Sequence, residues 1–515
     1  MKKTLFFVAA LVLGFGVQAQ DTYLNNMLVN GTGDLYGTSR YVGMGGAMGA
    51  LGADLSTMSF NPAGIALYRR SDINLTAGAL WNQDGSRIGS NSKGTFDQAG
   101  AVFASRPSGS TNFVFGFNYQ KKINYNSAFD IVGGMLSGLS QMDMLSDLVN
   151  YGYVNYDDDG PCNLAALAHN ESYLSRKEIP KPHYYNMYRM QEYDADYHFS
   201  GSLNSYDIDF AFNHKDRIYV GFDMGFESLS FDAFTRYSEW FYPMESAPKT
   251  GDYTLNNDIQ VTGWGFNMKF GIIARPFDES PFRIGLAVET PTWYRLRNST
   301  RFDLYDDYAS VRSDQIESII NFRLTTPWRV RASMGSTIGN YLAWDVDYEI
   351  ANWSGMSQSY DDADDYHMTQ HMNRNLATMH LLKVGVEGKL SKSFALRAGY
   401  NYASAPMAEN VSFDQCDINS LAMDFATRTS YMRMKPTNII TLGMGYKYKS
   451  FYADVAYKLR SQKADFYAFD TTFDTDNSEK AFFIYDYPEL EGRTIDPVEI
   501  NKTTHQITAT LGFKF

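Results

Sequence analysis

Residues 217–229 read RIYVGFDMGFESL, and the alternation in this stretch decides the fold class. Apolar side chains occupy every second position from Ile218 to Phe226, while glycine or an acidic residue follows most of them. Successive side chains of a β-strand point to opposite faces, so this period of two predicts a strand with one apolar and one polar face. Such a strand suits a wall that separates lipid from a polar interior.

The same alternation recurs along the chain, most clearly in residues 111–121, 341–350 and 505–515. Weaker examples are residues 72–82, 95–105, 205–214, 258–275, 281–297, 319–335, 381–390, 394–402, 437–448 and 451–459. Together these segments make about fourteen strands, an even number, as in closed bacterial outer-membrane barrels. The sequence therefore predicts an all-β chain, folded as a transmembrane antiparallel β-barrel over residues 72–515.

After the first strand, the connections between the predicted strands alternate between long and short. The short ones are residues 106–110, 214–217, 275–281, 336–340, 391–393 and 449–450, and the long ones are residues 83–94, 122–204, 230–257, 298–317, 351–380, 403–436 and 460–504. Outer-membrane barrels have short periplasmic turns and long extracellular loops. A soluble β-sandwich or propeller also contains many alternating strands, but it gives no reason for every long loop to lie at one end.

The first nineteen residues have the features of a secretory signal peptide. Lys2 and Lys3 precede an apolar run over residues 5–17, and Val17-Gln18-Ala19 places small residues where a signal peptidase cuts. The run is shorter than the ~20 residues of a membrane-spanning helix. We therefore expect residues 1–19 to be removed after Ala19.

Hydropathy and aromatic content together favour a barrel in the outer membrane of a Gram-negative bacterium. The mean hydropathy is -0.35, which is ordinary for a water-soluble protein. Yet aromatic residues make up 15% of the chain, with 37 Tyr and 35 Phe, and these types are favoured in strands and at membrane interfaces. A barrel reconciles the two facts, because only every second residue of a strand faces lipid.

Charge, cysteine content and motifs exclude several classes of function. A formal net charge of -13 makes nucleic acid an improbable partner. Cys162 and Cys416 form neither a disulfide framework nor a cysteine metal motif, and whether they pair with each other stays open. We find no Gly-x-Ser-x-Gly, no His-Glu-x-x-His and no catalytic triad, so the sequence predicts a non-enzyme with no catalytic residue and no cofactor.

Two features leave metal or haem binding as an alternative. His367 and His371 lie four residues apart, as do Met368 and Met372, and on a helix each pair would share a face. Acidic residues cluster at 157–159 and 361–365, where carboxylates could hold calcium. Ordinary solvated loops explain both features, so the sequence predicts no metal site.

Between the signal peptide and the first strand, residues 20–71 do not alternate. Residues 40–50 read RYVGMGGAMGA, with Gly43, Gly45 and Gly46, and Asn61-Pro62-Ala63-Gly64 follows. A nucleotide-binding loop would need a third glycine in register or a Gly-Lys-Ser/Thr, and neither is present. Glycines let backbone pack closely against backbone, and Asn-Pro fixes a turn, so this segment is expected to form a compact plug in the barrel lumen.

At these residues the chain resembles the FadL/TodX-type outer-membrane transporters of hydrophobic compounds. The resemblance rests on Val42-Gly43-Met44-Gly45-Gly46-Ala47, on Asp54 with Ser56, and on Asn61-Pro62-Ala63-Gly64 just before the first strand. In outline it covers the whole chain, down to a terminal Phe515 of the kind that outer-membrane assembly machinery favours. Residues 324–331, with Pro327-Trp328, also look like a Pro-containing strand start of the family.

The resemblance implies a hatch over residues 20–71, a ligand site inside the barrel, and sideways release through an inward kink of the third strand. That strand would be residues 111–121, with Gly116 as the candidate for the kink. The implied activity is passive uptake of long-chain fatty acids or similar hydrophobic small molecules. The basic residues that meet a carboxylate in the family cannot be placed in this sequence.

A predicted external loop contains the candidate for the ligand-entry surface. Within residues 128–149, Ile131, Met135, Leu136, Leu139 and Met142 recur at helical spacing, which predicts an amphipathic helix. In the family such loop helices form an apolar landing surface. A helix that merely packs on its neighbours is an equally open interpretation.

The sequence thus predicts an outer-membrane channel for hydrophobic small molecules. Its partners would be the ligand, outer-membrane lipid and, through Phe515, the barrel-assembly machinery. Three alternatives remain: a surface-binding or adhesin-like barrel, a haem-binding receptor without transport, and a membrane-embedded hydrolase. The sequence does not reveal the ligand or the oligomeric state.

Overall fold

The structure is a computed structural model, and it describes most of the barrel. The described residues are 28, 31, 33–84, 93–105, 111–143, 174–177, 183–186, 190–241, 250–306, 311–313, 315–360, 366–408, 430–469 and 495–515. The predicted signal peptide and the first residues of the predicted hatch lie outside them, as do both cysteines and both acidic clusters.

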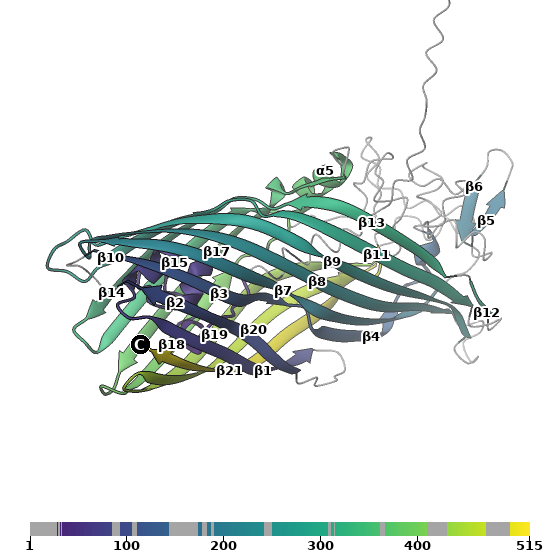
Figure 1. Cartoon of the computed structure of the whole chain (residues 1–515). Coiled ribbons are helices and arrows are strands. Elements are labelled where there is room, and N and C mark those ends of the chain that lie inside the picture. Colours follow the sequence, from purple (N-terminus) through teal and green to yellow (C-terminus); the bar gives the residue numbers. More distant parts are fainter. Residues whose placement is uncertain are drawn as a thin grey trace, which may run out of the picture.

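The strands form one closed antiparallel barrel, which confirms the predicted fold class (Figure 1). β1 pairs on one side with β2 and on the other with β21, so the first and last wall strands close the sheet. The bounds are β1 (Asp72–Asp84), β2 (Lys93–Ala104), β3 (Asn112–Asn124), β4 (Ser127–Met135), β7 (Glu192–His214), β8 (Ile218–Phe241), β9 (Thr250–Ala274), β10 (Arg283–Glu289), β11 (Trp293–Asp306), β12 (Val311–Arg312), β13 (Ile316–Thr325), β14 (Arg329–Ile338), β15 (Leu342–Asn352), β16 (Ser357–Ser359), β17 (Thr378–Lys389), β18 (Phe394–Ala403), β19 (Tyr431–Tyr448), β20 (Phe451–Tyr467) and β21 (Val498–Lys514).

The remaining elements are short. They are the helices α2 (Ser39–Gly43) and α5 (Tyr366–Asn375), the 3-10 helices η1 (Leu55–Ser59), η2 (Pro62–Leu67) and η3 (Trp353–Gly355), and the two-stranded sheet of β5 (Leu174–Lys177) and β6 (His183–Asn186). Within the described ranges, no helix is both long enough and apolar enough to span a bilayer.

Two wall strands are interrupted at a proline, where the sequence predicted single strands over residues 281–297 and 319–335. β10 ends before Pro291 and β11 follows it, while β13 ends before Pro327 and β14 follows it. Proline cannot donate to a ladder, so both strands break at the same level of the wall. Thr292 and Thr326 bridge the two breaks, since the Thr292 amide donates to the Thr326 hydroxyl at 2.9 Å and the Thr326 amide to the Thr292 carbonyl at 3.1 Å.

Several strands are much longer than predicted. β7, β8 and β9 contain 23, 24 and 25 residues, about 80 Å at ~3.3 Å per residue, whereas crossing a bilayer takes ~9–11 residues. The predicted loops at residues 122–204, 230–257 and 298–317 are therefore wrong in part, because the wall continues into them as strand. The barrel extends well beyond the membrane on the side opposite the short turns.

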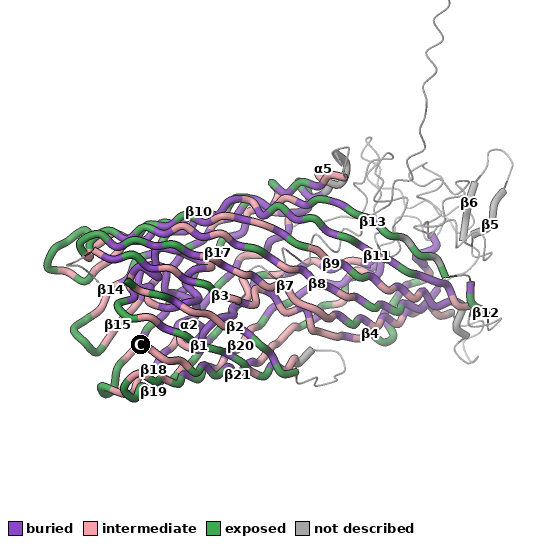
Figure 2. The backbone as a smooth tube through the Cα atoms, in the orientation of Figure 1, coloured by how far each residue is buried: buried purple, intermediate pink, exposed green. Residues whose placement is uncertain are grey.

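The polarity of the wall inverts along these long strands. Near the short turns, Ile218, Val220 and Phe226 of β8 face outward, 40–47% exposed, while Asp223 is buried inside. Farther along β8 the inward positions are apolar, with Phe231 1% exposed, and the outward positions include polar residues. Figure 2 shows the resulting alternation of buried and exposed positions along the wall.

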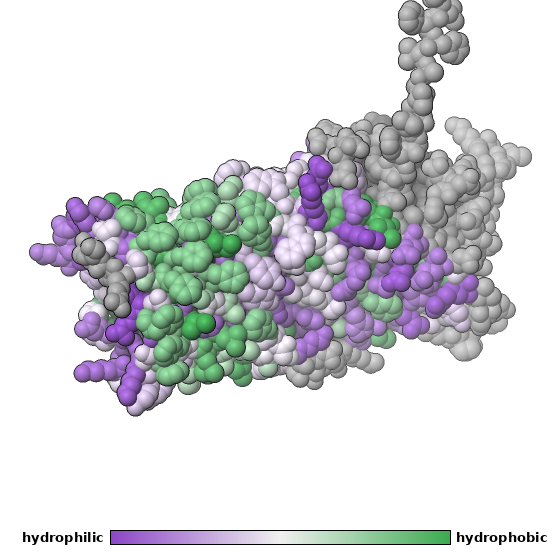
Figure 3. Space-filling view, in the orientation of Figure 1, coloured by the Kyte–Doolittle hydropathy of each residue, from purple (hydrophilic) through white to green (hydrophobic). Residues whose placement is uncertain are grey.

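The inversion divides the outer surface into two zones. An apolar belt surrounds the half of the barrel near the short turns, and the wall beyond it is largely hydrophilic (Figure 3). The belt is the membrane-spanning part, so the short turns lie on the periplasmic side and the long strands project outward from the cell. We call the apolar interior of the projecting half the upper lumen.

Candidate functional site

Residues 31–71, here called the luminal segment, lie inside the membrane-spanning half of the barrel. Its helix α2 packs against β18, β19, β20 and β21, and η2 packs against β3, β7, β8 and β9 (Figure 1). The segment therefore contacts the wall on several sides. Its predicted motif residues Gly43, Gly45, Gly46, Asn61, Pro62 and Ala63 are all buried there.

A row of wall glycines receives the glycine-rich part of the luminal segment. Gly385 of β17, Gly399 of β18 and Gly443 of β19 face the backbone of Gly43 and Met44, and a Cβ at any of the three would collide with or crowd that backbone. Gly45 and Gly46 have φ values of 65° and 73°, a conformation that favours glycine. Glycine is thus needed on both sides of this contact.

A second glycine row, on β8, β9 and β10, receives the Asn61-Pro62-Ala63 turn. Cβ atoms on Gly221 or Gly271 would collide with the backbone or side chains of this turn. Asn61 caps η2 by accepting a hydrogen bond from the Ala63 amide at 3.2 Å, and its side-chain amide donates to the Gly49 carbonyl at 2.9 Å. Asn61 therefore joins the two motifs of the luminal segment.

Two adjacent carboxylates of β15 hold the luminal segment to the wall. The amides of Met48 and Gly49 donate to Asp347 at 3.1 Å, and those of Ala50 and Leu51 donate to Asp345 at 3.1 and 2.8 Å. Four consecutive N–H groups thus bind two carboxylates. Four hydrogen bonds to two side chains of one strand make this contact a principal attachment of the luminal segment.

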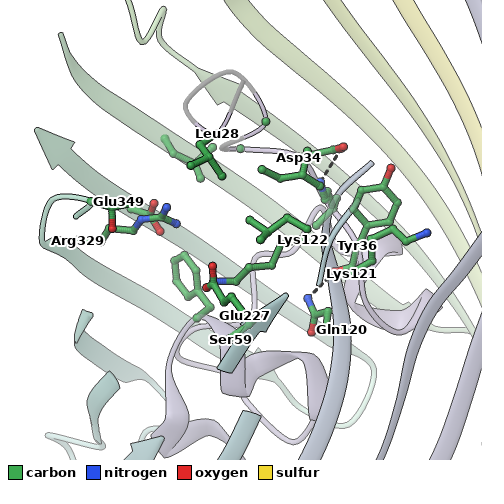
Figure 4. A pocket seen from close by; sticks show the side chains of 18 of the residues that line it. Leu28, Asp34, Tyr36, Ser59, Gln120, Lys121, Lys122, Glu227, Arg329 and Glu349 are labelled. Atoms are coloured by element: carbon green, nitrogen blue, oxygen red, sulfur yellow. Dashed lines mark hydrogen bonds and ion pairs between the residues drawn. The ribbon is translucent and has the colours of Figure 1, made fainter. Parts of the chain in front are cut away.

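A small chamber lies on the extracellular side of the luminal segment (Figure 4). Its volume is about 100 Å³, and both apolar and charged side chains line it. The apolar ones are Leu28, Leu35, Tyr36, Tyr41, Phe60, Ile123, Leu203, Tyr294, Trp353 and Leu381, and the charged ones are Asp34, Lys121, Lys122, Glu227, Arg329, Arg331, Glu349 and Lys383. Five basic residues against three acidic ones give the lining a net positive charge.

Some of these charges neutralise one another. Lys122 pairs with Glu227 at 2.5 Å, and Arg331 pairs with Glu289 and Glu349 at 2.6 Å each. In the described part of the chain, Lys121, Arg329 and Lys383 have no carboxylate within ion-pair distance. Arg329 lies over the Trp353 ring at 5.1 Å, and Lys383 lies over the Phe60 ring at 4.2 Å. These three cations can receive an anionic group.

Above the chamber, aromatic side chains fill the upper lumen. The rings of Phe129 and Tyr197 stack with centroids 4.8 Å apart, and Phe466 contacts both at 6.0 and 5.5 Å. They belong to one continuous apolar cluster that descends to Ile123, Leu203, Tyr294 and Trp353, which also line the chamber. The interior therefore offers an apolar column that ends at a basic chamber.

The predicted entry helix over residues 128–149 is wrong for its first part, because residues 127–135 form strand β4. The ladder between β4 and β7 shifts register between Ile131 and Gly134, and Gly133 has a φ of 68°. This bulge explains the four-residue spacing of Ile131 and Met135 within a strand, whereas residues 141–143 are helical. Residues 144–149 lie outside the described ranges.

The predicted entry residues are mostly interior. Ile131, Leu136, Leu139 and Met142 are at most 4% exposed and belong to the apolar cluster of the upper lumen, whereas Met135 is 66% exposed. They therefore do not form an exposed landing surface. Residues 136–143, here called the mouth segment, instead contribute apolar side chains to the upper lumen.

Glu239 anchors the mouth segment and predicts a pH dependence. Its carboxylate accepts hydrogen bonds from the Ser140 hydroxyl at 2.5 Å and the Gln141 amide at 2.8 Å. Burial raises the pKa of this carboxyl from 4.5 to about 7. A raised carboxyl pKa means that the stabilisation is complete below about pH 4.5 and is lost as the pH rises through 7.

We therefore expect the amides of the mouth segment to exchange with deuterium about tenfold faster at pH 8 than at pH 5, after correction for intrinsic exchange. Glu239→Gln cannot ionise and should abolish this difference. Persistence of the difference in the variant would show that another group controls the segment.

The prediction that Gly116 marks a weak point of the wall is wrong. It pairs in unbroken register with Val102 of β2 and Asp209 of β7. The need for glycine there is steric, since a Cβ would collide with Met58 of the luminal segment. The irregularity in β3 lies farther along, where the β3–β7 register shifts between Lys121 and Ile123.

Beyond this point the wall has a seam. The β2–β3 ladder begins at Gln98 and Gln120, although β2 starts at Lys93 and β3 continues to Asn124. Side chains bridge the separated strands. The side-chain amide of Asn82 donates to the backbone carbonyl of Asn126 at 2.7 Å, and the Lys93 ammonium donates to the side-chain oxygen of Asn126 at 2.8 Å. We call this region the β1–β4 seam.

Cavities lie on both sides of the β1–β4 seam. One, of about 80 Å³, includes Tyr36 and Ile123 in its lining, which also line the chamber, and the other, of about 220 Å³, includes the outward residues His198 and Asp232. Both are lined by Leu80, Asn82, Asn126 and Ser127. The same few side chains therefore separate the interior from the outside.

Sequence reasoning missed the three cations of the chamber. Lys121 follows the alternating part of β3, and Arg329 follows the proline break in the wall, so irregularity of the alternation could have marked these two. Lys383 gives no such signal, because a charged inward residue is ordinary in a strand of a polar lumen. Only the closed fold brings the three together.

The histidines and methionines of the metal and haem alternative lie on one short helix. Residues 367, 368 and 371 belong to α5, a helix as that alternative required, but their side chains lie outside the described set. Met372 is buried in the apolar cluster of the upper lumen. Within the described ranges, no group of three His, Cys, Asp or Glu side chains is arranged to hold a metal ion.

The closed wall, the apolar belt and the occupied lumen define an outer-membrane β-barrel of a Gram-negative bacterium. No protein-family model and no curated protein sequence matches the chain.

Solved structures do match the chain. A FadL homologue of Pseudomonas aeruginosa is 12% identical, with a TM-score of 0.54 over 94% of this chain and 99% of that one. The toluene transporters TodX of P. putida and TbuX of Ralstonia pickettii are 11% and 13% identical, each with a TM-score of 0.47 over 94% of this chain and 99% of theirs. The resemblance to FadL/TodX-type barrels is confirmed at the level of the fold.

Proposed function

We propose that this protein is a passive channel that takes up hydrophobic small molecules bearing an anionic group, such as long-chain fatty acids. The observation that carries the proposal is the inverted polarity of the projecting half, whose apolar interior leads to a chamber with three cations that form no ion pair with any described residue. Apolar pockets with a few convergent polar groups are typical ligand sites. Transport of this kind needs no reaction.

The upper lumen supplies the apolar contacts. The chamber is too small for a long chain, so the bound molecule would place its anionic end among Lys121, Arg329 and Lys383 and its chain between the aromatic rings above. Those rings must shift to admit it, and the mouth segment contributes Leu136, Leu139 and Met142 to the same cluster. Residues 136–143 would therefore act as the entry gate.

The β1–β4 seam supplies the exit. It is adjacent to the chamber, it lacks a continuous backbone ladder, and a second cavity lies on its outer side. A hydrophobic molecule leaving there would enter the membrane sideways. The luminal segment would close the direct path to the periplasm, which is the role of a hatch.

A triple variant of the chamber tests the ligand class. Lys121→Gln, Arg329→Gln and Lys383→Gln together should weaken binding of a long-chain fatty acid by roughly 100-fold, because three charge-assisted contacts to the carboxylate are lost. Binding of the methyl ester should change less than about threefold. The measurement is displacement of a fluorescent fatty acid from the detergent-solubilised protein.

The matched control is the triple variant Lys463→Gln, Lys435→Gln, Arg312→Gln. It removes the same charge from exposed or half-exposed sites of the projecting half. Equal losses for the acid and the ester in the chamber variant would contradict an anionic head group. Unchanged binding of both would contradict the chamber as the site.

A further inference from the structure

A second cavity lies on the periplasmic side of the luminal segment. Its volume is about 640 Å³, and it lies between the luminal segment and the periplasmic ends of strands β14, β15 and β17–β21 together with the start of β1. Thr38, Arg40 and Asp54 of the luminal segment form its inner wall. We call it the vestibule.

The vestibule and the chamber lie on opposite faces of α2. Tyr41 lines the chamber, whereas the adjacent Arg40 lines the vestibule. The two cavities share no lining residue. A ligand in one is therefore separated from the other by the luminal segment, and the vestibule requires its own explanation.

Three of the four acidic groups that line the vestibule are paired with cations. The Glu387 carboxylate forms ion pairs with Arg40 at 3.0 Å and with Arg397 at 2.7 Å, and Arg397 also forms an ion pair with Asp454 at 2.5 Å. Asp72 accepts hydrogen bonds from the Tyr452 hydroxyl at 3.0 and 3.1 Å and lies 3.6 Å from the Lys514 ammonium. Asp54 accepts hydrogen bonds from the Thr38 hydroxyl at 2.8 Å. Asp54 is therefore held by neutral donors, and the other three carboxylates each meet a cation.

Three lysines at the mouth have no such partner. Lys389 and Lys392 lie at the turn between β17 and β18, and Lys447 lies near the end of β19, all three exposed. Within the described ranges none of them forms an ion pair. Six basic and four acidic residues line the cavity. Its electrostatic field therefore attracts anions, although the formal net charge of the whole chain is -13.

The walls between these lysines are partly aromatic. Tyr68, Tyr341, Phe394, Tyr446 and Tyr452 contribute rings to the lining. A cavity of 640 Å³ falls in the size range of sites for small organic ligands, about 300–1,000 Å³. Cations at the mouth combined with rings in the wall fit a molecule with a negative head and an apolar body.

We propose that the vestibule is a second binding site, for an anionic amphiphile on the periplasmic side. The head group, a carboxylate or a phosphate, lies among Lys389, Lys392 and Lys447, and the chain lies against the aromatic wall. Two sources share this chemistry: a transported fatty acid and a lipid of the inner leaflet. The choice of a fatty-acid probe rests on the proposed function.

The test is photolabelling of the full-length protein in phosphatidylcholine nanodiscs, with a long-chain fatty acid that carries a diazirine, followed by mapping of the labelled peptides. We expect labels on the peptides that contain Phe394 and Tyr452. The variant Lys389→Gln, Lys392→Gln, Lys447→Gln should reduce this labelling roughly tenfold, since exposed ion pairs contribute ~0.2–1 kcal/mol each. The methyl ester of the probe should give the same low level in the wild-type protein.

Arg70→Gln, Lys215→Gln, Arg217→Gln is the matched control, because it removes the same charge from the periplasmic rim outside the vestibule. Its vestibule labelling should equal that of the wild type. Equal vestibule labelling in the lysine variant, or by the ester, would overturn the proposal.

The two proposals can fail separately. Labels near Tyr294 and Trp353 without labels in the vestibule would leave the proposed function standing and remove the second site. Labels in the vestibule alone would support the second site and count against the chamber. Loss of vestibule labelling when phosphatidylglycerol is added to the nanodiscs would support the site and identify membrane lipid as its occupant.

Discussion

Asp345→Ala with Asp347→Ala is expected to release the luminal segment while the barrel stays assembled. The four amides of residues 48–51 would lose their acceptors, and each hydrogen bond to a charged group contributes ~1.5–3 kcal/mol. If each lost partner costs ~1 kcal/mol or more and half of the total is recovered by water, local opening should become at least about 30-fold more populated. Deuterium exchange of residues 48–51 should accelerate by the same factor.

The same double variant should make the channel leaky. Wild-type protein in planar bilayers should show rare, small conductance events, and the variant should show frequent, larger ones. Asp196→Ala with Glu499→Ala removes two partly exposed carboxylates from the projecting half and serves as the control. Heat-modifiable electrophoretic mobility checks that all barrels are folded. Unaltered exchange and conductance in the double variant would mean that the glycine rows alone hold the segment.

Filling the β1–β4 seam is expected to stop uptake without stopping binding. Ser127 lines both cavities of the seam and is small, so Ser127→Trp places a large ring between the interior and the outside. If ligands leave by this route, uptake of a long-chain fatty acid by cells should fall at least about tenfold, an increase of ~1.4 kcal/mol in the barrier. The dissociation constant for the fatty acid should stay within about threefold of the wild type.

Ser202→Trp is the matched control for this variant. Ser202 lies on the neighbouring strand β7 and lines neither cavity of the seam. It should assemble and transport normally. Normal uptake by Ser127→Trp, with the protein correctly assembled, would exclude the seam as the exit. Loss of both binding and uptake would show that the ring disturbs the chamber instead.

The membrane-spanning half of the barrel could be predicted from the sequence because lipid imposes a strict pattern there. Val220 and Phe226 face lipid, and the alternate residues Gly221, Asp223 and Gly225 are buried inside, so the apolar parity is clear. Beyond Ser228 the strand β8 continues, but its apolar parity moves inside, with Leu229 and Phe231 buried. The alternation keeps its period of two, but the apolar side chains change from the outer to the inner face of the wall. From the sequence alone, that half of the strand is therefore assigned to a loop.

Local signals located the luminal segment but not the chamber. Gly45 and Asn61 have roles set by their own backbone geometry, so they are recognisable in a single sequence. Lys121, Arg329 and Lys383 come from three different strands and acquire meaning only when the barrel closes. The entry residues failed for a third reason, since the bulge at Gly133 gives a strand the spacing of a helix.

The most direct test of the whole account is uptake of a radiolabelled long-chain fatty acid by a Gram-negative host that lacks its own transporter of this kind. Cells that carry this protein in the outer membrane should take up the fatty acid at least about tenfold faster than cells that carry the chamber variant Lys121→Gln, Arg329→Gln, Lys383→Gln at the same level. Equal rates in the two strains, and in cells without the protein, would contradict a channel for hydrophobic compounds.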